Sequence, residues 1–149
     1  MKDSIGLQLF LIRIYVGLNF LPYAIQQLFM GKQIRLMVAQ VYKQMELPYP
    51  EYLVIFVGIC MLLAFLGLTL GFFTRLVAFL AFVFLIVAIF LGKHNEAGFF
   101  WFMPGGGWEF LAFWSFVCLS FILTGAGKYS IDKKMRQLNL PLLLRFLIK

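Results

Sequence analysis

The sequence predicts an all-α integral membrane protein, and three observations lead to this class. Of its 149 residues, 63% are hydrophobic and only 13% are charged, whereas soluble domains carry roughly 25% charged residues. The apolar residues form long runs, and a helix needs about 20 mostly apolar residues to cross a bilayer. Short polar segments separate these runs. We therefore expect a four-transmembrane-helix bundle with an outer amphipathic helix and a basic cytoplasmic C-terminal tail.

Four apolar segments define the expected membrane domain, which covers residues 1–133. Their bounds are close to 7–30, 53–70, 76–91 and 110–124. The first segment carries Arg13 and lacks a small-residue cleavage pattern, so we expect it to be retained as a helix rather than removed as a signal peptide. The second and third segments are joined by the short stretch GFFTR, where Gly71 can end one helix and Thr74 can cap the next. These two helices should therefore be antiparallel neighbours.

The distribution of lysine and arginine predicts the orientation of the bundle. Eight of these residues lie outside the spans on the side of the termini: Lys2, Arg75, Lys128, Lys133, Lys134, Arg136, Arg145 and Lys149. Four lie on the opposite side: Lys32, Arg35, Lys43 and Lys93. Because cytoplasmic segments carry the excess of basic residues, both termini should face the cytoplasm. The net charge of +7 is then suited to anionic lipid headgroups, and no nucleic-acid partner is expected.

Two segments outside the four spans are amphipathic. In the first loop, Ile34, Val38, Val41 and Met45 recur at helical spacing until Pro48 ends the pattern. This helix should lie along the outer membrane surface or cover the bundle, and a plain connector is the alternative. The tail, residues 134–149, combines basic and apolar residues, which suits either an anionic headgroup layer or a docked partner protein.

Polar residues within the first apolar segment indicate a binding pocket. Tyr15, Asn19 and Gln26 are spaced so that they share one stripe of the helix, which climbs toward the outer surface. The stretch HNEAGFFWFMPGGGWEFLAFW, residues 94–114, should lie at that end. The residues expected to line an outward-opening pocket are Tyr15, Asn19, Gln26, His94, Glu96, Trp101, Trp108 and Glu109. The alternative is that the amides only tie helices together, at about 0.6 kcal/mol each, while the tryptophans form an interfacial belt.

Arg13 and the two cysteines are expected to have structural roles. Arg13 falls about 160° from the Asn19 stripe at 100° per residue, and it should snorkel toward the headgroups or meet Asp132; an anion or headgroup contact is the alternative. Cys60 and Cys118 lie in apolar runs and should act as small hydrophobes. No metal site is predicted, because one histidine near Glu96 lacks the required ligand number. No self-contained catalytic motif is present in the sequence.

Several motifs resemble the DoxX family of small four-helix membrane proteins. LPYPEYL precedes the second span, GFFTRL follows it, and PGGGWE and LTGAGKYSID flank the fourth, so the likeness covers most of residues 7–133. The positions that fit the family pattern are Arg13, Gly71, Thr74, Arg75, Gly127, Ser130 and Asp132. Two positions depart from it. The family often has Gly-x-x-Lys-Leu where this chain has Ala24, Gln27 and Leu28, and commonly has a glutamate where this chain has Met61.

The resemblance implies a membrane protein linked to redox chemistry. The family is similar to the DoxD subunit of thiosulfate:quinone oxidoreductase, and other members are parts of membrane-associated oxidoreductase complexes. We therefore expect an accessory or quinone-binding subunit in the bacterial inner membrane, with a quinone as the one cofactor to consider. A redox-enzyme partner and a homo-oligomer are the expected associations. The alternative function is a non-enzymatic assembly protein that scaffolds another membrane protein.

Overall fold

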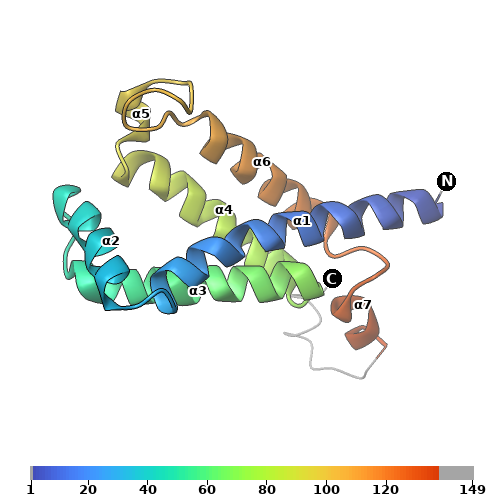
Figure 1. The fold of residues 1–149 in the computed structure, drawn as a ribbon. Helices are drawn as coiled ribbons and strands as arrows, with labels where there is room; N and C mark the ends of the chain where they lie inside the picture. Colours follow the sequence, from blue (N-terminus) through green and yellow to red (C-terminus); the bar gives the residue numbers. More distant parts are fainter. Residues whose placement is uncertain (1, 138–149) are drawn as a thin grey trace.

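The computed structural model describes residues 2–137, and every regular element in that part of the chain is a helix (Figure 1). In chain order the helices are α1 (Lys2–Leu28), α2 (Lys32–Gln44), α3 (Pro50–Leu70), α4 (Thr74–Leu91), α5 (His94–Ala97), α6 (Glu109–Thr124) and α7 (Ile131–Met135). This confirms the predicted helical membrane bundle. Most of the expected tail, from residue 138 onward, lies outside the described residues.

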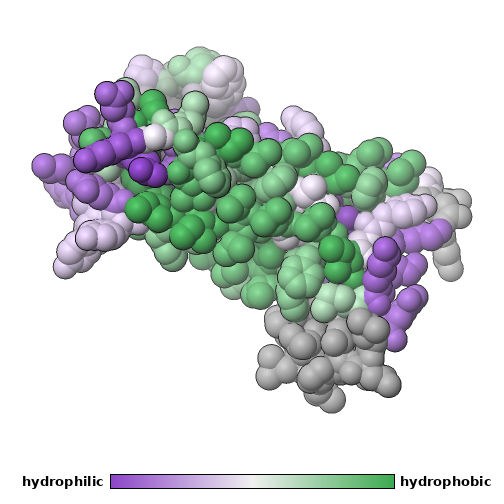
Figure 2. All heavy atoms as spheres, turned by 60° about the horizontal axis from the view of Figure 1, so that its bottom comes forward, coloured by the Kyte–Doolittle hydropathy of each residue, from purple (hydrophilic) through white to green (hydrophobic). Residues whose placement is uncertain are grey.

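Three of these helices are long and apolar enough to cross a membrane: Ser4–Leu28 within α1, Pro50–Leu70 and Thr74–Leu91. The fourth apolar helix, α6, has 16 residues and extends about 24 Å at 1.5 Å per residue, which is shorter than a hydrocarbon core of about 30 Å. Figure 2 shows hydrophobic side chains across the middle of one face and hydrophilic ones at its two ends. The chain is therefore a multi-pass membrane protein.

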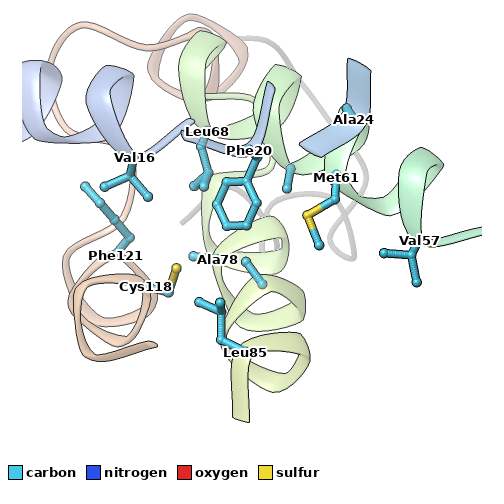
Figure 3. Close-up of a cluster of buried hydrophobic side chains, with 12 residues drawn as sticks. Val16, Phe20, Ala24, Val57, Met61, Leu68, Ala78, Leu85, Cys118 and Phe121 are labelled. Atoms are coloured by element: carbon cyan, nitrogen blue, oxygen red, sulfur yellow. The ribbon is translucent and has the colours of Figure 1, made fainter. Parts of the chain in front are cut away.

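The apolar helices form two antiparallel pairs. α1 packs chiefly along α3, and α4 packs chiefly along α6. The N-terminus, the α3–α4 turn and α7 lie at one end of the molecule, which we call the terminal end; α2 and α5 lie at the other, the loop end (Figure 1). All four apolar helices contribute to one core, seen in Figure 3, which includes Val16, Phe20, Met61, Leu68, Ala78, Leu85, Cys118 and Phe121.

Arg13 joins α1 to the segment that follows α6. Its side chain is only 1% exposed and is the largest of the fully buried side chains. Its Nη1 donates a hydrogen bond to the Ala126 carbonyl at 2.7 Å, and its Nη2 donates to the Tyr129 carbonyl at 2.6 Å. The prediction that Arg13 reaches the lipid headgroups is therefore wrong, because two backbone carbonyls hold the guanidinium inside the protein.

Asp132 supplies the N-terminal cap of α4 from a position far along the chain. Its Oδ1 accepts from the Phe73 amide at 2.7 Å, and its Oδ2 accepts from the Thr74 amide at 2.9 Å. Its own amide donates to the Gly71 carbonyl at 2.9 Å. The first amides of a helix lack internal partners, and α4 has no side-chain cap of its own. The predicted cap by Thr74 is therefore wrong, since Asp132 performs that role.

The remaining motif residues complete this junction. The Ser130 hydroxyl accepts from the Lys133 amide at 3.2 Å and caps α7. Arg75 does not pair with Asp132; its Nη2 donates to the Leu123 carbonyl at 3.2 Å. Asp132 and Arg13 form no direct ion pair, but they are close enough to attract each other electrostatically. We call Arg13, Asp132 and the backbone groups that they bind the Arg13–Asp132 junction.

The substitution Gly71→Ala should destabilise the fold strongly. Gly71 has a φ of +68°, which costs an L-residue about 1–2 kcal/mol, and a Cβ there would overlap the Arg13 guanidinium. Gly106→Ala is the matched control, because Gly106 has a φ of +67° and a Cβ there would meet its nearest atoms at 3.6 Å. Thermal unfolding in detergent should show a clearly larger loss for Gly71→Ala. Equal losses would show that Arg13 moves aside without cost.

The substitution Asp132→Asn should lower the free energy of unfolding by about 1.5–3 kcal/mol, the usual size of a hydrogen bond to a charged group. An asparagine keeps one acceptor oxygen and turns an NH₂ group toward the second α4 amide. The exposed Glu46 provides a comparison, since Glu46→Gln removes a charge without touching a cap. Unfolding of the two variants in the same detergent distinguishes a capping role from a general charge effect, which would destabilise both alike.

Candidate functional site

A cavity of about 290 Å³ lies between the two helix pairs, toward the loop end. Small-molecule sites usually measure about 300–1,000 Å³, so this one is at the lower end of that range. Its apolar walls come from α1, α3, α4 and α6: Val16, Phe20, Val57, Met61, Phe84, Leu85, Ala88, Phe110 and Leu111. Several of these side chains are seen at the core in Figure 3. The cavity therefore continues the hydrophobic core rather than forming a solvated cleft.

Gln27 and Tyr42 provide polar groups at the loop end of the cavity. Gln27 lies one residue before the end of α1 and is only 6% exposed. Its Oε1 atom is buried and has no hydrogen-bond partner among the described residues. Burial raises the pKa of Tyr42, on α2, and a hydrogen-bonding contact with the Gln27 side chain partly offsets that rise. The phenol is therefore neutral at physiological pH, while the Gln27 oxygen is available to a donor.

His94 contributes a third polar group at the same end. Its Nδ1 is hydrogen-bonded to the Gly106 carbonyl, and because a carbonyl only accepts, Nδ1 carries the proton. In the neutral ring, Nε2 is then an acceptor. The loop that holds His94 is pinned by two further bonds, from the Trp108 amide to the Gly98 carbonyl and from the Glu109 amide to the Phe99 carbonyl. These contacts fix the ring beside the cavity.

Asn19 and Trp114 line the deeper part of the cavity. The Asn19 amide nitrogen donates to the Tyr15 carbonyl of its own helix at 2.7 Å, which leaves its Oδ1 as an acceptor. The indole Nε1 of Trp114, on α6, is buried and has no hydrogen-bond partner in the described part of the chain. An indole nitrogen is a donor only. Two residues that line the cavity thus each carry one buried polar atom without a partner, the acceptor Gln27 Oε1 and the donor Trp114 Nε1.

The structure brings together two of the eight residues predicted to line a pocket, Asn19 and His94. Gln26 is exposed on the lipid side of α1, and its neighbour Gln27 faces the cavity in its place. Tyr15 is 62% exposed and does not line the cavity. The centroid of its ring lies 5.9 Å from that of the Trp114 ring. The predicted stripe therefore follows a neighbouring face of α1.

The other four predicted residues lie away from the cavity. Glu96 is exposed on α5. Trp101 and Glu109 border a separate surface groove, and Trp101 is 65% exposed. Trp108 packs edge-on against Phe99 at a centroid distance of 4.8 Å. The PGGGW loop reaches the cavity only indirectly, through the Gly106 carbonyl that holds His94.

Tyr42 and Trp114 were not predicted as lining residues, although the sequence contains a signal for each. Tyr42 follows Val38 by four positions on the apolar face of α2, so an inward-facing α2 would have placed it over the bundle. Trp114 follows Phe110 by four positions on α6, and both line the cavity. The two positions at which the sequence departs from the DoxX pattern, Gln27 and Met61, also line it. The cavity therefore has neutral side chains at both.

Within the described residues, no group of three or more histidine, cysteine, aspartate or glutamate side chains could hold a metal ion. Cys60 and Cys118 are free thiols, the first half-buried and the second buried.

Comparison with known proteins assigns the chain to a family. No curated protein and no solved structure gives a significant match. The model of the DoxX family matches residues 8–94, which is more than half of the chain. The matched part runs from α1 to the first residue of α5, so it includes Gln27, Tyr42 and His94, whereas α6 with Trp114 lies beyond it. The chain belongs to the DoxX family.

Proposed function

We propose that this DoxX-family protein binds a quinone, or an amphipathic ring compound of similar size, and serves as an accessory subunit of a membrane redox system. The observation that carries the proposal is the pair of unpaired buried atoms, Gln27 Oε1 and Trp114 Nε1, within otherwise apolar walls. Each unpaired buried polar group costs about 1–3 kcal/mol. A ligand that supplies their partners recovers this cost, which makes the cavity selective for a molecule with polar groups on an apolar ring.

The chemistry of a quinone is complementary to these groups. A quinone carbonyl accepts from the Trp114 indole, and the hydroxyl of the reduced form donates to Gln27 Oε1 or to His94 Nε2. The rings of Phe20, Phe84 and Phe110 offer apolar and edge contacts to a flat ring. In this proposal the electrons come from a partner enzyme, and this chain holds and orients the ring. His94 is suited to accept a hydrogen bond from the bound hydroxyl at Nε2, because Nδ1 carries the proton that binds the Gly106 carbonyl.

Purified protein should bind a benzoquinone that carries a single isoprenoid unit. Gln27→Leu and Trp114→Phe should each weaken binding about fivefold, since each removes one hydrogen bond worth about 1 kcal/mol. The matched controls are Gln26→Leu and Trp101→Phe, which change the same residue types at exposed positions. Equilibrium dialysis in detergent measures the bound quinone. The proposal fails if wild-type protein binds none, or if the controls lose as much affinity as the cavity variants.

We further propose that both termini face the cytoplasm of a bacterial inner membrane. The start of α1 and the segment before α7 lie together, because a Cβ on Gly6 would be 3.3 Å from the Lys128 Cβ. The same end carries Arg75, Lys133 and Lys134, which supports a cytoplasmic location through the bias of basic residues.

Cysteine labelling tests this orientation. In a background with Cys60 and Cys118 replaced by alanine, Lys134→Cys should resist a membrane-impermeant maleimide in intact spheroplasts. Gln44→Cys, at the loop end, should react. Both native side chains are exposed in the structure, so accessibility depends on the side of the membrane. Labelling of Lys134→Cys with protection of Gln44→Cys would reverse the orientation.

A further inference from the structure

We infer that the ligand enters the cavity sideways from the bilayer, through a mouth between α1 and α6, with its headgroup inside and its tail left in the lipid. This inference rests on the proposed function. It restricts the proposed ligands to lipid-dissolved molecules with a compact ring headgroup and a long apolar tail. The inference depends on where the cavity is open, where it is covered and how much it can hold.

The exposed residues of the lining mark the mouth. Tyr23, on α1, is 51% exposed, and Phe110, on α6, is 47% exposed. Every other lining residue is buried or half-buried. Because α1 packs chiefly on α3, and α6 chiefly on α4, the sides of α1 and α6 at the mouth are not covered by another helix pair. Tyr23 lies in the last two turns of α1 and Phe110 in the first turn of α6, and in our inference the mouth between them opens to the bilayer.

Aromatic side chains bound the mouth on the side of the terminal end, and residues of α2 and α5 bound it at the loop end. Toward the terminal end, the Tyr15 and Trp114 rings meet at a centroid distance of 5.9 Å and bridge α1 and α6. At the loop end, Tyr42 from α2 and His94 from α5 lie over the cavity. The His94 ring is tied to Gly106, and Tyr42 contacts Gln27. The side toward water is thus covered by fixed side chains, while the side toward lipid is not.

The volume of the cavity limits what it encloses. About 290 Å³ is at the lower end of the range for small-molecule sites, about 300–1,000 Å³, so a ring headgroup fits but a long tail does not. The polar groups of Gln27, Tyr42 and His94 gather at the loop end, and the walls nearer the mouth are apolar. A headgroup in contact with these polar atoms therefore directs its tail past Tyr23 and Phe110 into the bilayer.

Blocking the mouth tests the inference. In protein lacking Cys60 and Cys118, Tyr23→Cys is modified with N-phenylmaleimide, which places an added ring at the mouth. A benzoquinone with a long polyisoprenoid tail is dissolved in phosphatidylethanolamine and phosphatidylglycerol vesicles that contain the protein, and quenching of tryptophan fluorescence follows its association. Modification should slow association by at least about tenfold. Phe110→Cys, modified in the same way from the opposite helix, should have the same effect.

Leu18→Cys is the matched control, because Leu18 is exposed on the same helix but does not line the cavity. Its modification should leave the rate unchanged, and each modified variant is compared with the same variant before modification, which cancels the effect of the substitution itself. The inference is overturned if modified Tyr23→Cys binds the long-tailed quinone at the parent rate; quinone binding itself then stands. If the parent protein binds neither the long-tailed nor the short-tailed quinone, the proposed function fails together with the inference.

Discussion

The rest of the structure depends on the Arg13–Asp132 junction. A charged group in a membrane protein is costly unless its polar atoms find partners inside the protein. Arg13 binds two carbonyls beyond α6 through Nη1 and Nη2, although its Nε is unpaired, and Asp132 binds two amides at the start of α4. These bonds connect α1, α4 and the segment after α6 at the terminal end. Because the junction fixes that end alone, the two helix pairs can separate toward the loop end and leave a cavity between them.

Among the described residues, six buried side-chain polar atoms lack hydrogen-bond partners: Arg13 Nε, Thr69 Oγ1, Thr74 Oγ1 and Arg75 Nε near the terminal end, and one atom each of the cavity-lining Gln27 and Trp114. At the terminal end, both carboxylate oxygens of Asp132 are used by the fold. At the loop end, Gln27 Oε1 and Trp114 Nε1 are buried without partners. An unpaired buried donor or acceptor raises the free energy of the folded state. A ligand that pairs with both is a sufficient physical reason for keeping them.

The sequence predicted the positions of the helices, but it did not predict which face of α1 lines the cavity. Apolar length predicted the spanning helices, and helical spacing predicted α2. The stripe through Tyr15, Asn19 and Gln26 is displaced by roughly 80°, at 100° per residue, from the face that carries Val16, Tyr23 and Gln27. Lipid and protein core are both apolar, so hydrophobicity does not distinguish the two sides of α1. The residue that caps α4 could not be predicted from the local sequence either, because Asp132 lies 58 residues after Thr74.

The composition of the cavity also bears on what kind of headgroup it selects. Gln27 and Met61, which line the cavity, are neutral side chains. A fixed charge in an apolar cavity favours a counter-charge and penalises a neutral ligand that leaves it unpaired. The neutral pair removes that penalty, so hydrogen bonds and ring contacts determine selectivity. The donor, Trp114, comes from α6, beyond the region that matches the family. The ligand preference that we propose therefore depends partly on a residue outside the matched family region.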